Sequence, residues 1–440
     1  MSYIILFPII IIGLFYLIKY PEIAFVLFVN AGIFKADPRF QLPEPLDWTI
    51  LLALISIVGI FRKRIMKRTI YPQIHRNILI PYIIMAALSI ISYSYTLSPI
   101  YGEIKLLKFL TLTSYALFGP IYIIRDVNDM RRFFGTYVGL SIITFGDVIM
   151  AGEIQTFKYN FTQAFGSSGY LVLGKISGEV SIIVALYYYL NQNKIWLRAI
   201  SIALLISNIY LTLITGARGS AIALGVVLII AILFLVGKII KNNIVLNKSL
   251  SKTGLKIILS IIVILISVNI FTIENKEKFS SLIARTSQLT NNINTSVPVR
   301  IHQFKIAIDI LTTMPTAFTG LGIGGFSMYA HGYDKTRGAF VHNIFLDIGV
   351  DIGVIGLLSF IIMIILALKT CLQLLKYDKS DDNYYIRITL LTLLLFMLFY
   401  SSVHGNINDS RSLLTWVGTI YAYETILRKQ IYYKRHQIGR

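Results

Sequence analysis

The sequence predicts an all-α polytopic membrane protein with 12–13 transmembrane helices and one large helical extracytoplasmic loop. Composition is the first reason: of the 440 residues, 56% are hydrophobic and 14% are charged, and the mean hydropathy is +0.71. A soluble protein carries about 25% charged residues. The composition therefore excludes a soluble enzyme, a disordered chain and a disulfide-rich secreted module.

The second reason is a series of apolar runs that approach the length of about 20 residues needed to cross a bilayer. They are continuous and lack the alternation of barrel strands. The run at 22–35 is short, so 12 or 13 spans are expected. Lys19-Tyr20-Pro21 follows the first run where a signal peptide would have small residues, so this run is interpreted as a retained helix. The runs lie at about 3–19, 22–35, 47–61, 78–95, 106–124, 133–151, 169–191, 198–215, 219–240, 257–273, 342–369, 387–403 and 412–427.

The basic loops predict the orientation, because short cytoplasmic loops collect Lys and Arg. Residues 62–77, 238–256 and the tail after 427 are strongly basic, and they are assigned to the cytoplasmic side together with 125–132 and 370–386. The net charge of +20 is then explained by topology, and no nucleic-acid partner is expected. The segments expected outside are 96–105, 152–168, 216–219, 274–341 and 404–411.

The longest outer segment divides the chain into three parts: a transmembrane bundle at 1–273, a loop at 274–341, and C-terminal helices with a basic cytoplasmic tail at 342–440. Structureless loops of this length are unusual. Ser296 and Pro298 predict a helix start within the loop, and Pro315 predicts its end. The glycine run that follows, 320–325, is not a nucleotide-binding fingerprint, because no strand precedes it.

Three outer-side cations, Arg218, Arg300 and His342, each lie close to a predicted helix N-terminus. Such N-termini bind anions, a guanidinium pairs with phosphate in a bidentate manner, and a histidine there is biased towards the neutral form that suits a general base. Taken singly, they could be an interfacial anchor, a solvated loop charge and a helix cap. Their common side and setting favour a functional site.

The helix predicted after His342 carries glycines on the same face as the histidine. At 100° per residue, Gly349 and Gly353 lie about 20° and Gly356 about 40° from His342. Glycines allow a neighbouring helix or a lipid chain to approach closely, and a plain helix-packing seam would explain them equally well. Asp347 and Asp351 fall on the other side and are poor candidates for a carboxylate partner of His342.

Lys108, Asp147, Lys175, Glu179 and Glu424 lie inside predicted spans, where ionisable groups are functional candidates. Lys108 and Lys175 are therefore candidate substrate-binding residues. The four-residue spacing of Lys175 and Glu179 favours a structural ion pair, with a substrate path as the alternative.

The remaining histidines and the cysteine suggest no further site. His302, His331 and His404 are interpreted as solvated outer-side residues without metal-ligand spacing, and Cys371 as a buried structural thiol that excludes an internal disulfide. No metal or cofactor is expected.

These residues resemble the motifs of the O-antigen ligase and polymerase superfamily. His342-Asn343, nine residues, and Gly353-Val354-Ile355-Gly356 are similar to its His-Asn-x9-Gly-x-x-Gly signature. The turn at 217–220 resembles the family's arginine turn, and the segment from Arg300 to the glycine run resembles the stretch before the histidine. The similarity covers about 199–370 by motif and the first third only in its pattern of spans. Leu357 stands where some ligases have Thr-Gly, which weakens the ligase assignment.

The resemblance implies a GT-C-like, metal-independent, inverting glycosyltransferase at the outer face of the bacterial cytoplasmic (inner) membrane. Its donor would be an undecaprenyl-diphosphate-linked glycan and its acceptor a sugar hydroxyl. Arg218 and Arg300 would neutralise the leaving diphosphate, His342 would take the proton from the hydroxyl or orient it, and Asn343 would bind substrate. A chain-length regulator and a flippase are further partners that the resemblance suggests.

Three functions stay open at this point. A repeat-unit polymerase is favoured, because the abundant Ile, Lys, Asn and Tyr indicate an AT-rich genome. A ligase that transfers glycan to lipid A-core or protein would differ only in its acceptor. A flippase or transporter of lipid-linked sugars would need a polar path, which Lys108, Asp147, Lys175 and Glu179 could supply. The sequence does not specify the sugars, the linkage, the control of chain length, the oligomeric state or the side of the N-terminus.

Overall fold

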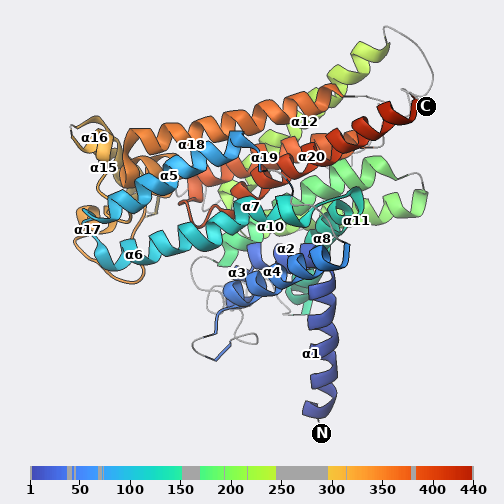
Figure 1. Cartoon of the computed structure of the whole chain (residues 1–440), viewed down its shortest axis with the longest axis horizontal. Helices are drawn as coiled ribbons and strands as arrows, with labels where there is room; N and C mark the ends of the chain where they lie inside the picture. Colours follow the sequence, from blue (N-terminus) through green and yellow to red (C-terminus); the bar gives the residue numbers. More distant parts are fainter. Residues whose placement is uncertain are drawn as a thin grey trace, which may run out of the picture.

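The computed structural model describes an elongated bundle of helices (Figure 1). The predicted run at 257–273, the loops at 152–168 and 244–256, the first part of the long loop, 274–295, and the side chain of Asp147 lie outside the described residues. The residues described are 2–36, 42–43, 46–67, 72, 74–150, 169–192, 194–215, 217–243, 296–313, 315–377 and 383–438.

All secondary structure in the described residues is helical, which confirms the all-α class. The first half comprises α1 (Ser2–Lys19), α2 (Pro21–Val29), α3 (Gly32–Ala36), α4 (Trp48–Lys67), α5 (Arg76–Tyr93), α6 (Pro99–Lys108), the π-helix η2 (Phe109–Thr113), α7 (Ser114–Ile123), α8 (Val127–Met150), α10 (Gly169–Ile182) and the π-helix η4 (Ile183–Tyr189). The second half comprises α11 (Ile195–Ile214), α12 (Arg218–Asn243), α15 (Ser296–Thr312), α16 (Thr316–Thr319), α17 (Phe326–His331), α18 (Ile344–Lys376), α19 (Tyr384–His404) and α20 (Arg411–Ile438).

Seven of the described helical segments are long and apolar enough to cross a membrane, so the chain is a multi-pass membrane protein. The expected 12–13 spans exceed this number. Helices α4, α8 and α20 occupy predicted runs but are not among the seven; α4 and α20 mix several charged residues with their apolar ones. The seven are Arg76–Tyr93, Pro99–Ile123, Leu171–Tyr189, Ile195–Leu213, Arg218–Val236, Ile344–Lys376 and Tyr384–His404.

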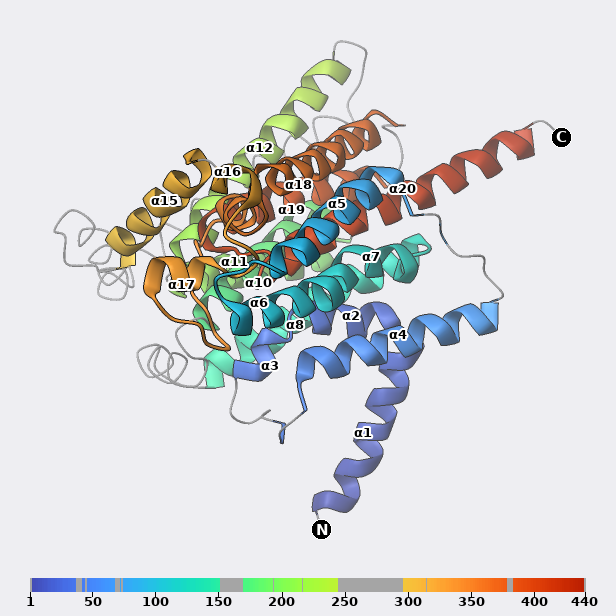
Figure 2. The ribbon, with the colours of Figure 1, turned by 60° about the vertical axis from the view of Figure 1, so that its left-hand side comes forward.

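The first two predicted runs form a broken pair. Residues Ile11–Lys19 of α1 and Pro21–Val29 of α2 meet at an angle of 100°, and together they are long and apolar enough for one span. The break falls at Tyr20-Pro21, where proline cannot continue the preceding hydrogen-bond ladder. Helix α2 is buried in the bundle, whereas α1 projects sideways from it in both views (Figures 1 and 2).

The loops assigned to one side of the membrane contact one another. On the side expected outside, the backbone N–H of Leu97 bonds to the carbonyl of Leu321, and Asp334 accepts from the N–H groups of Ile100 and Tyr101. On the other side, Lys63 lies 2.6 Å from Asp129. Helices α15, α16 and α17 gather at the end of the bundle opposite the C-terminus (Figure 1). The described helix of the long loop begins at Ser296, as the sequence predicts.

Helix α18 runs through the bundle and packs against α5, α16 and α19, while α20 packs against α7. The core contains Trp416, which contacts the rings of Phe133 and Tyr137. Burying large aromatic side chains supplies much of the packing energy within such a core. Helix α18 also packs against α15, so it contacts two helices of the long outer loop.

Candidate functional site

His342 stands directly before α18 in an unusual backbone conformation. Its φ is 61°, and it is the one residue other than glycine with a positive φ in the described part of the chain. Residues other than glycine rarely adopt this region, although Asn, Asp and His do so more often than the rest, and such conformations tend to be kept at functional positions. The ring centroid of Phe340 lies 4.2 Å from that of His342. The conformation turns the histidine out of the helix that follows.

Asn343 fixes the start of α18. Its Oδ1 accepts hydrogen bonds from the N–H groups of Phe345 at 2.9 Å and Leu346 at 3.2 Å. This is an N-cap, which satisfies two backbone donors that have no partner within the helix. The structure thus gives Asn343 a positioning role next to His342, and its predicted role in substrate binding stays a prediction.

The environment of His342 holds its imidazole neutral. Partial burial, and then the positive charge of Arg300, lower the pKa of His342 to about 4, against a smaller opposing effect of Asp347. The sequence predicts the neutral form from the helix N-terminus alone, whereas burial and the neighbouring arginine are the main causes here. A neutral imidazole can accept a hydrogen bond from a hydroxyl.

Arg300, on α15, brings its side chain close to His342. Its Nη1 lies 3.4 Å from Nδ1 of His404, the last residue of α19. The positive charge of Arg300 also lowers the pKa of His342. Arg300, His342 and His404 therefore come together from three separate segments of the chain. The interpretation of His404 as a solvated residue is therefore wrong, because its ring is packed between Arg300, Tyr400 and the start of α12. His302 and His331 are exposed, as expected.

Arg218 opens α12, and the residue after it touches the cluster. A Cβ atom built on Gly219 would overlap Nε2 of His404. The arginine turn thus comes next to the side chains of α15 and α19, because only a glycine lets the histidine ring approach the helix backbone so closely. The prediction that Arg218, Arg300 and His342 belong to one end of the bundle agrees with this geometry.

The glycine motif breaks α18 rather than lining one face of it. Ile352 and Gly353 leave helical geometry, and Gly353 has a φ of 75°. A Cβ on Gly353 would overlap the carbonyl oxygen of Phe318 in α16, so α16 packs into the break. The predicted stripe assumed a regular helix, and its angles do not hold beyond this point. Close approach of a neighbouring helix, the expected consequence of the glycines, is present.

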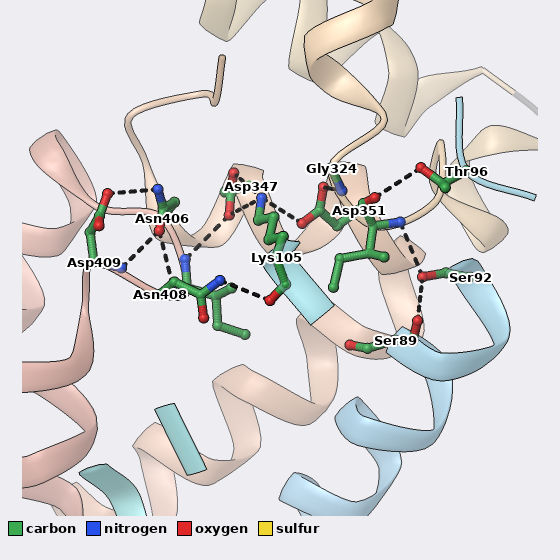
Figure 3. A network of polar contacts seen from close by, with 12 residues as sticks. Ser89, Ser92, Thr96, Lys105, Gly324, Asp347, Asp351, Asn406, Asn408 and Asp409 are labelled. Atoms are coloured by element: carbon green, nitrogen blue, oxygen red, sulfur yellow. Dashed lines mark hydrogen bonds and ion pairs between the residues drawn. The ribbon is translucent and has the colours of Figure 1, made fainter. Parts of the chain in front are cut away.

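A second charged cluster lies beside the first and is fully buried (Figure 3). Nζ of Lys105 lies 3.0 Å from Asp347 and 2.7 Å from Asp351, and the three residues are 2%, 1% and 4% exposed. Asp351 also accepts from the N–H of Gly324, and Asp347 from the N–H of Ile407. Lys105 is not among the predicted site residues, because 96–105 was expected to be a loop, whereas α6 begins at Pro99.

Lys175 and Glu179 do not pair directly. Lys175 donates to Ser412 at 2.7 Å, and Glu179 accepts from the indole N–H of Trp416 at 2.7 Å, so both are bound to α20. The favoured direct ion pair is therefore wrong. Lys108 is exposed on α6. The charged neighbours of both lysines include Asp409 and Arg411 rather than Arg300 or His342, and their role in substrate binding stays a prediction.

One family model matches part of the chain. Residues 200–361 match the family model described as O-antigen ligase. The chain carries an O-antigen ligase domain. The match spans Arg218, Arg300, His342 and the α18 break, and it ends before His404. It supports the resemblance to the O-antigen ligase and polymerase superfamily and a general activity of that type. No curated protein matches the chain significantly.

Proposed function

We propose that the protein is a polysaccharide repeat-unit polymerase that uses an undecaprenyl-diphosphate-linked glycan at the outer face of the bacterial inner membrane. The observation that carries this proposal is the meeting of Arg300, His342 and the α12 start at one end of the bundle. That end lies opposite the C-terminus, whose basic tail belongs on the cytoplasmic side (Figure 1).

In the proposed reaction, a hydroxyl of the acceptor sugar attacks the anomeric carbon of the donor. The bond between that carbon and the diphosphate oxygen breaks, the configuration inverts, and the diphosphate leaves on its lipid. Arg300 and Arg218 pair with the leaving phosphates, since guanidinium groups match phosphate oxygens in geometry and charge. The charge that develops on the leaving group is then met by side chains already in place.

His342 receives the hydroxyl proton or orients the hydroxyl. A pKa of about 4 makes the resting histidine a weak base. Binding a diphosphate beside Arg300 would offset the positive charge that depresses this pKa and would make His342 a stronger base. The anionic donor would therefore prepare the base for the step that follows.

A ligase is the second candidate, and the description of the matching family favours it. It uses the same donor and the same three side chains, with lipid A-core or a protein as the acceptor. A transporter is less well supported, because Lys105, Lys175 and Glu179 hold partners inside the bundle instead of lining a polar path.

The test uses the purified protein with undecaprenyl-diphosphate-linked repeat units in EDTA, and the products are separated on a gel. A ladder of lengthening glycan supports a metal-independent polymerase, and transfer only after lipid A-core is added supports the ligase. His342→Ala is expected to lower the rate by about 10²–10⁴-fold, as for loss of a general base. Exposed His302→Ala is the matched control and should retain the rate. Absence of product with every acceptor would contradict the proposal.

A further inference from the structure

His404 has one ring nitrogen in contact with Arg300 and one that is unused. Nδ1 lies 3.4 Å from Nη1 of Arg300. A guanidinium carries only donors and is always charged, so the nitrogen that faces it must be the acceptor. The proton of a neutral imidazole is then on Nε2.

The protonated nitrogen is buried and points to the start of α12. Nε2 of His404 has no hydrogen-bond partner within the described residues, although its atom is shielded from solvent. It lies against Gly219, next to Arg218. Buried donors are nearly always paired in proteins, and an unpaired one is destabilising, so an orphan donor in a functional cluster needs an explanation.

The surroundings suggest what the partner is. Arg300 brings a positive charge to this place, Arg218 directly precedes Gly219 in the chain, and in the described residues His404 forms no salt bridge with a carboxylate. An N–H that faces such a cationic region is suited to an anionic oxygen, because a charged acceptor gives the stronger bond.

We propose that His404 is a further donor-binding residue: Nδ1 holds the Arg300 guanidinium, and Nε2–H donates to a phosphate oxygen of the lipid-linked diphosphate. This inference rests on the proposed function, because it takes the diphosphate as the ligand of the cluster. The family match ends at residue 361, so it does not assign this residue.

Two substitutions of His404 test the roles of its two ring nitrogens separately. In His404→Asn the amide oxygen can replace Nδ1 as the acceptor for Arg300, but no donor reaches the position of Nε2. In His404→Gln the amide N–H reaches that position, whereas the Nδ1 acceptor is lost. A residue that only fills space would make no such distinction between the two amides.

The measurement is the Kd of undecaprenyl diphosphate for the full-length protein in detergent, with undecaprenol as the probe that lacks phosphate. His404→Asn is expected to weaken diphosphate binding by about tenfold or more, the size of one hydrogen bond to a charged group. His404→Gln should bind within a few fold of the wild type, and undecaprenol binding should stay unchanged in both. His331→Asn and His331→Gln, at an exposed histidine, are the matched controls.

The binding results distinguish a failure of the proposed function from a failure of the role proposed for His404. A wild type that binds no diphosphate would contradict the proposed function itself. A wild type that binds diphosphate while both amides bind equally, whether well or poorly, would overturn the role of His404 alone. If His404→Asn does not fold, Gly219→Ala replaces it, because its methyl group would push the ring from its place. Unchanged diphosphate binding in Gly219→Ala would then overturn the proposal.

Discussion

Two charged clusters lie next to each other at the start of α18, and they differ in how completely their charges are satisfied. In the Lys105–Asp347–Asp351 cluster, the ammonium group contacts both carboxylates, and backbone N–H groups complete the set. In the Arg300–His342–His404 cluster, one histidine has a strained backbone and the other has an orphan nitrogen. Asp347 lies only five positions after His342 in the chain.

The difference separates a structural role from a functional one. Buried charges whose hydrogen bonds are all made hold elements in place, and here they connect α6, α18 and the loops at 320–325 and 405–410 (Figure 3). Strain and unmet hydrogen-bonding capacity are tolerated where a ligand uses them. The Lys105–Asp347–Asp351 cluster therefore has a structural role: it fixes the start of α18, which directly follows His342 of the other cluster.

The largest effect is expected from disrupting the buried Lys105–Asp347–Asp351 cluster. Lys105→Ala would leave two buried carboxylates side by side without a counter-charge. Removing one partner of a buried pair costs about 3–5 kcal/mol, and this loss should appear in the free energy of unfolding measured by denaturant titration in detergent. Lys108→Ala, one turn further along and exposed, is the matched control and should change little. Equal stability of the two variants would remove the distinction between the clusters.

The next effect tests the break in α18. Gly353→Ala places a methyl group against the Phe318 carbonyl at a φ of 75°. Strain of this kind costs about 1–3 kcal/mol before the overlap is counted, so the unfolding midpoint should fall. Gly225→Ala, at an exposed helical glycine with open space around it, should be neutral or stabilising. A Gly353→Ala protein as stable as Gly225→Ala would show that the motif glycine is not required by the packing.

A smaller effect is expected at the helix cap that joins the clusters. Asn343→Ala removes the bonds to the N–H groups of Phe345 and Leu346 and should cost about 1 kcal/mol of stability. Asn343→Asp keeps the accepting oxygen and is the control. If transfer falls in Asn343→Asp while stability does not, the amide N–H of Asn343 contacts substrate, as the sequence predicts. Equal transfer in Asn343→Asp and the wild type would leave Asn343 a cap only.

The sequence was informative where local chemistry decides position. Apolar runs predicted the helices, Ser296 and Pro298 predicted the start of α15, and the orientation of the loops predicted that Arg300 and His342 lie on the same side. Prediction from the sequence failed where contacts between distant segments determine the position of a residue. Lys105 and His404 are unremarkable in their own stretches of sequence. Lys105 meets its carboxylate partners on α18, and His404 meets Arg300 on α15 and Gly219 on α12, only in the packed structure.

The smallest expected effect is on how the stability of the protein depends on pH. The folded-state pKa of His342 is lowered to about 4 from an ordinary value of 6.5, so between these values the unfolded chain binds a proton that the folded chain does not. Stability contributed by the neutral histidine is complete above pH 6.5 and is lost as the pH falls towards 4. His342→Gln lacks this group, so its unfolding temperature should fall less than that of the wild type between pH 7 and pH 4.5. His302→Gln, at an exposed histidine, should follow the wild type. Parallel pH profiles for all three proteins would mean that His342 is not held neutral by burial and Arg300, and the contrast between the two clusters would then rest on geometry alone.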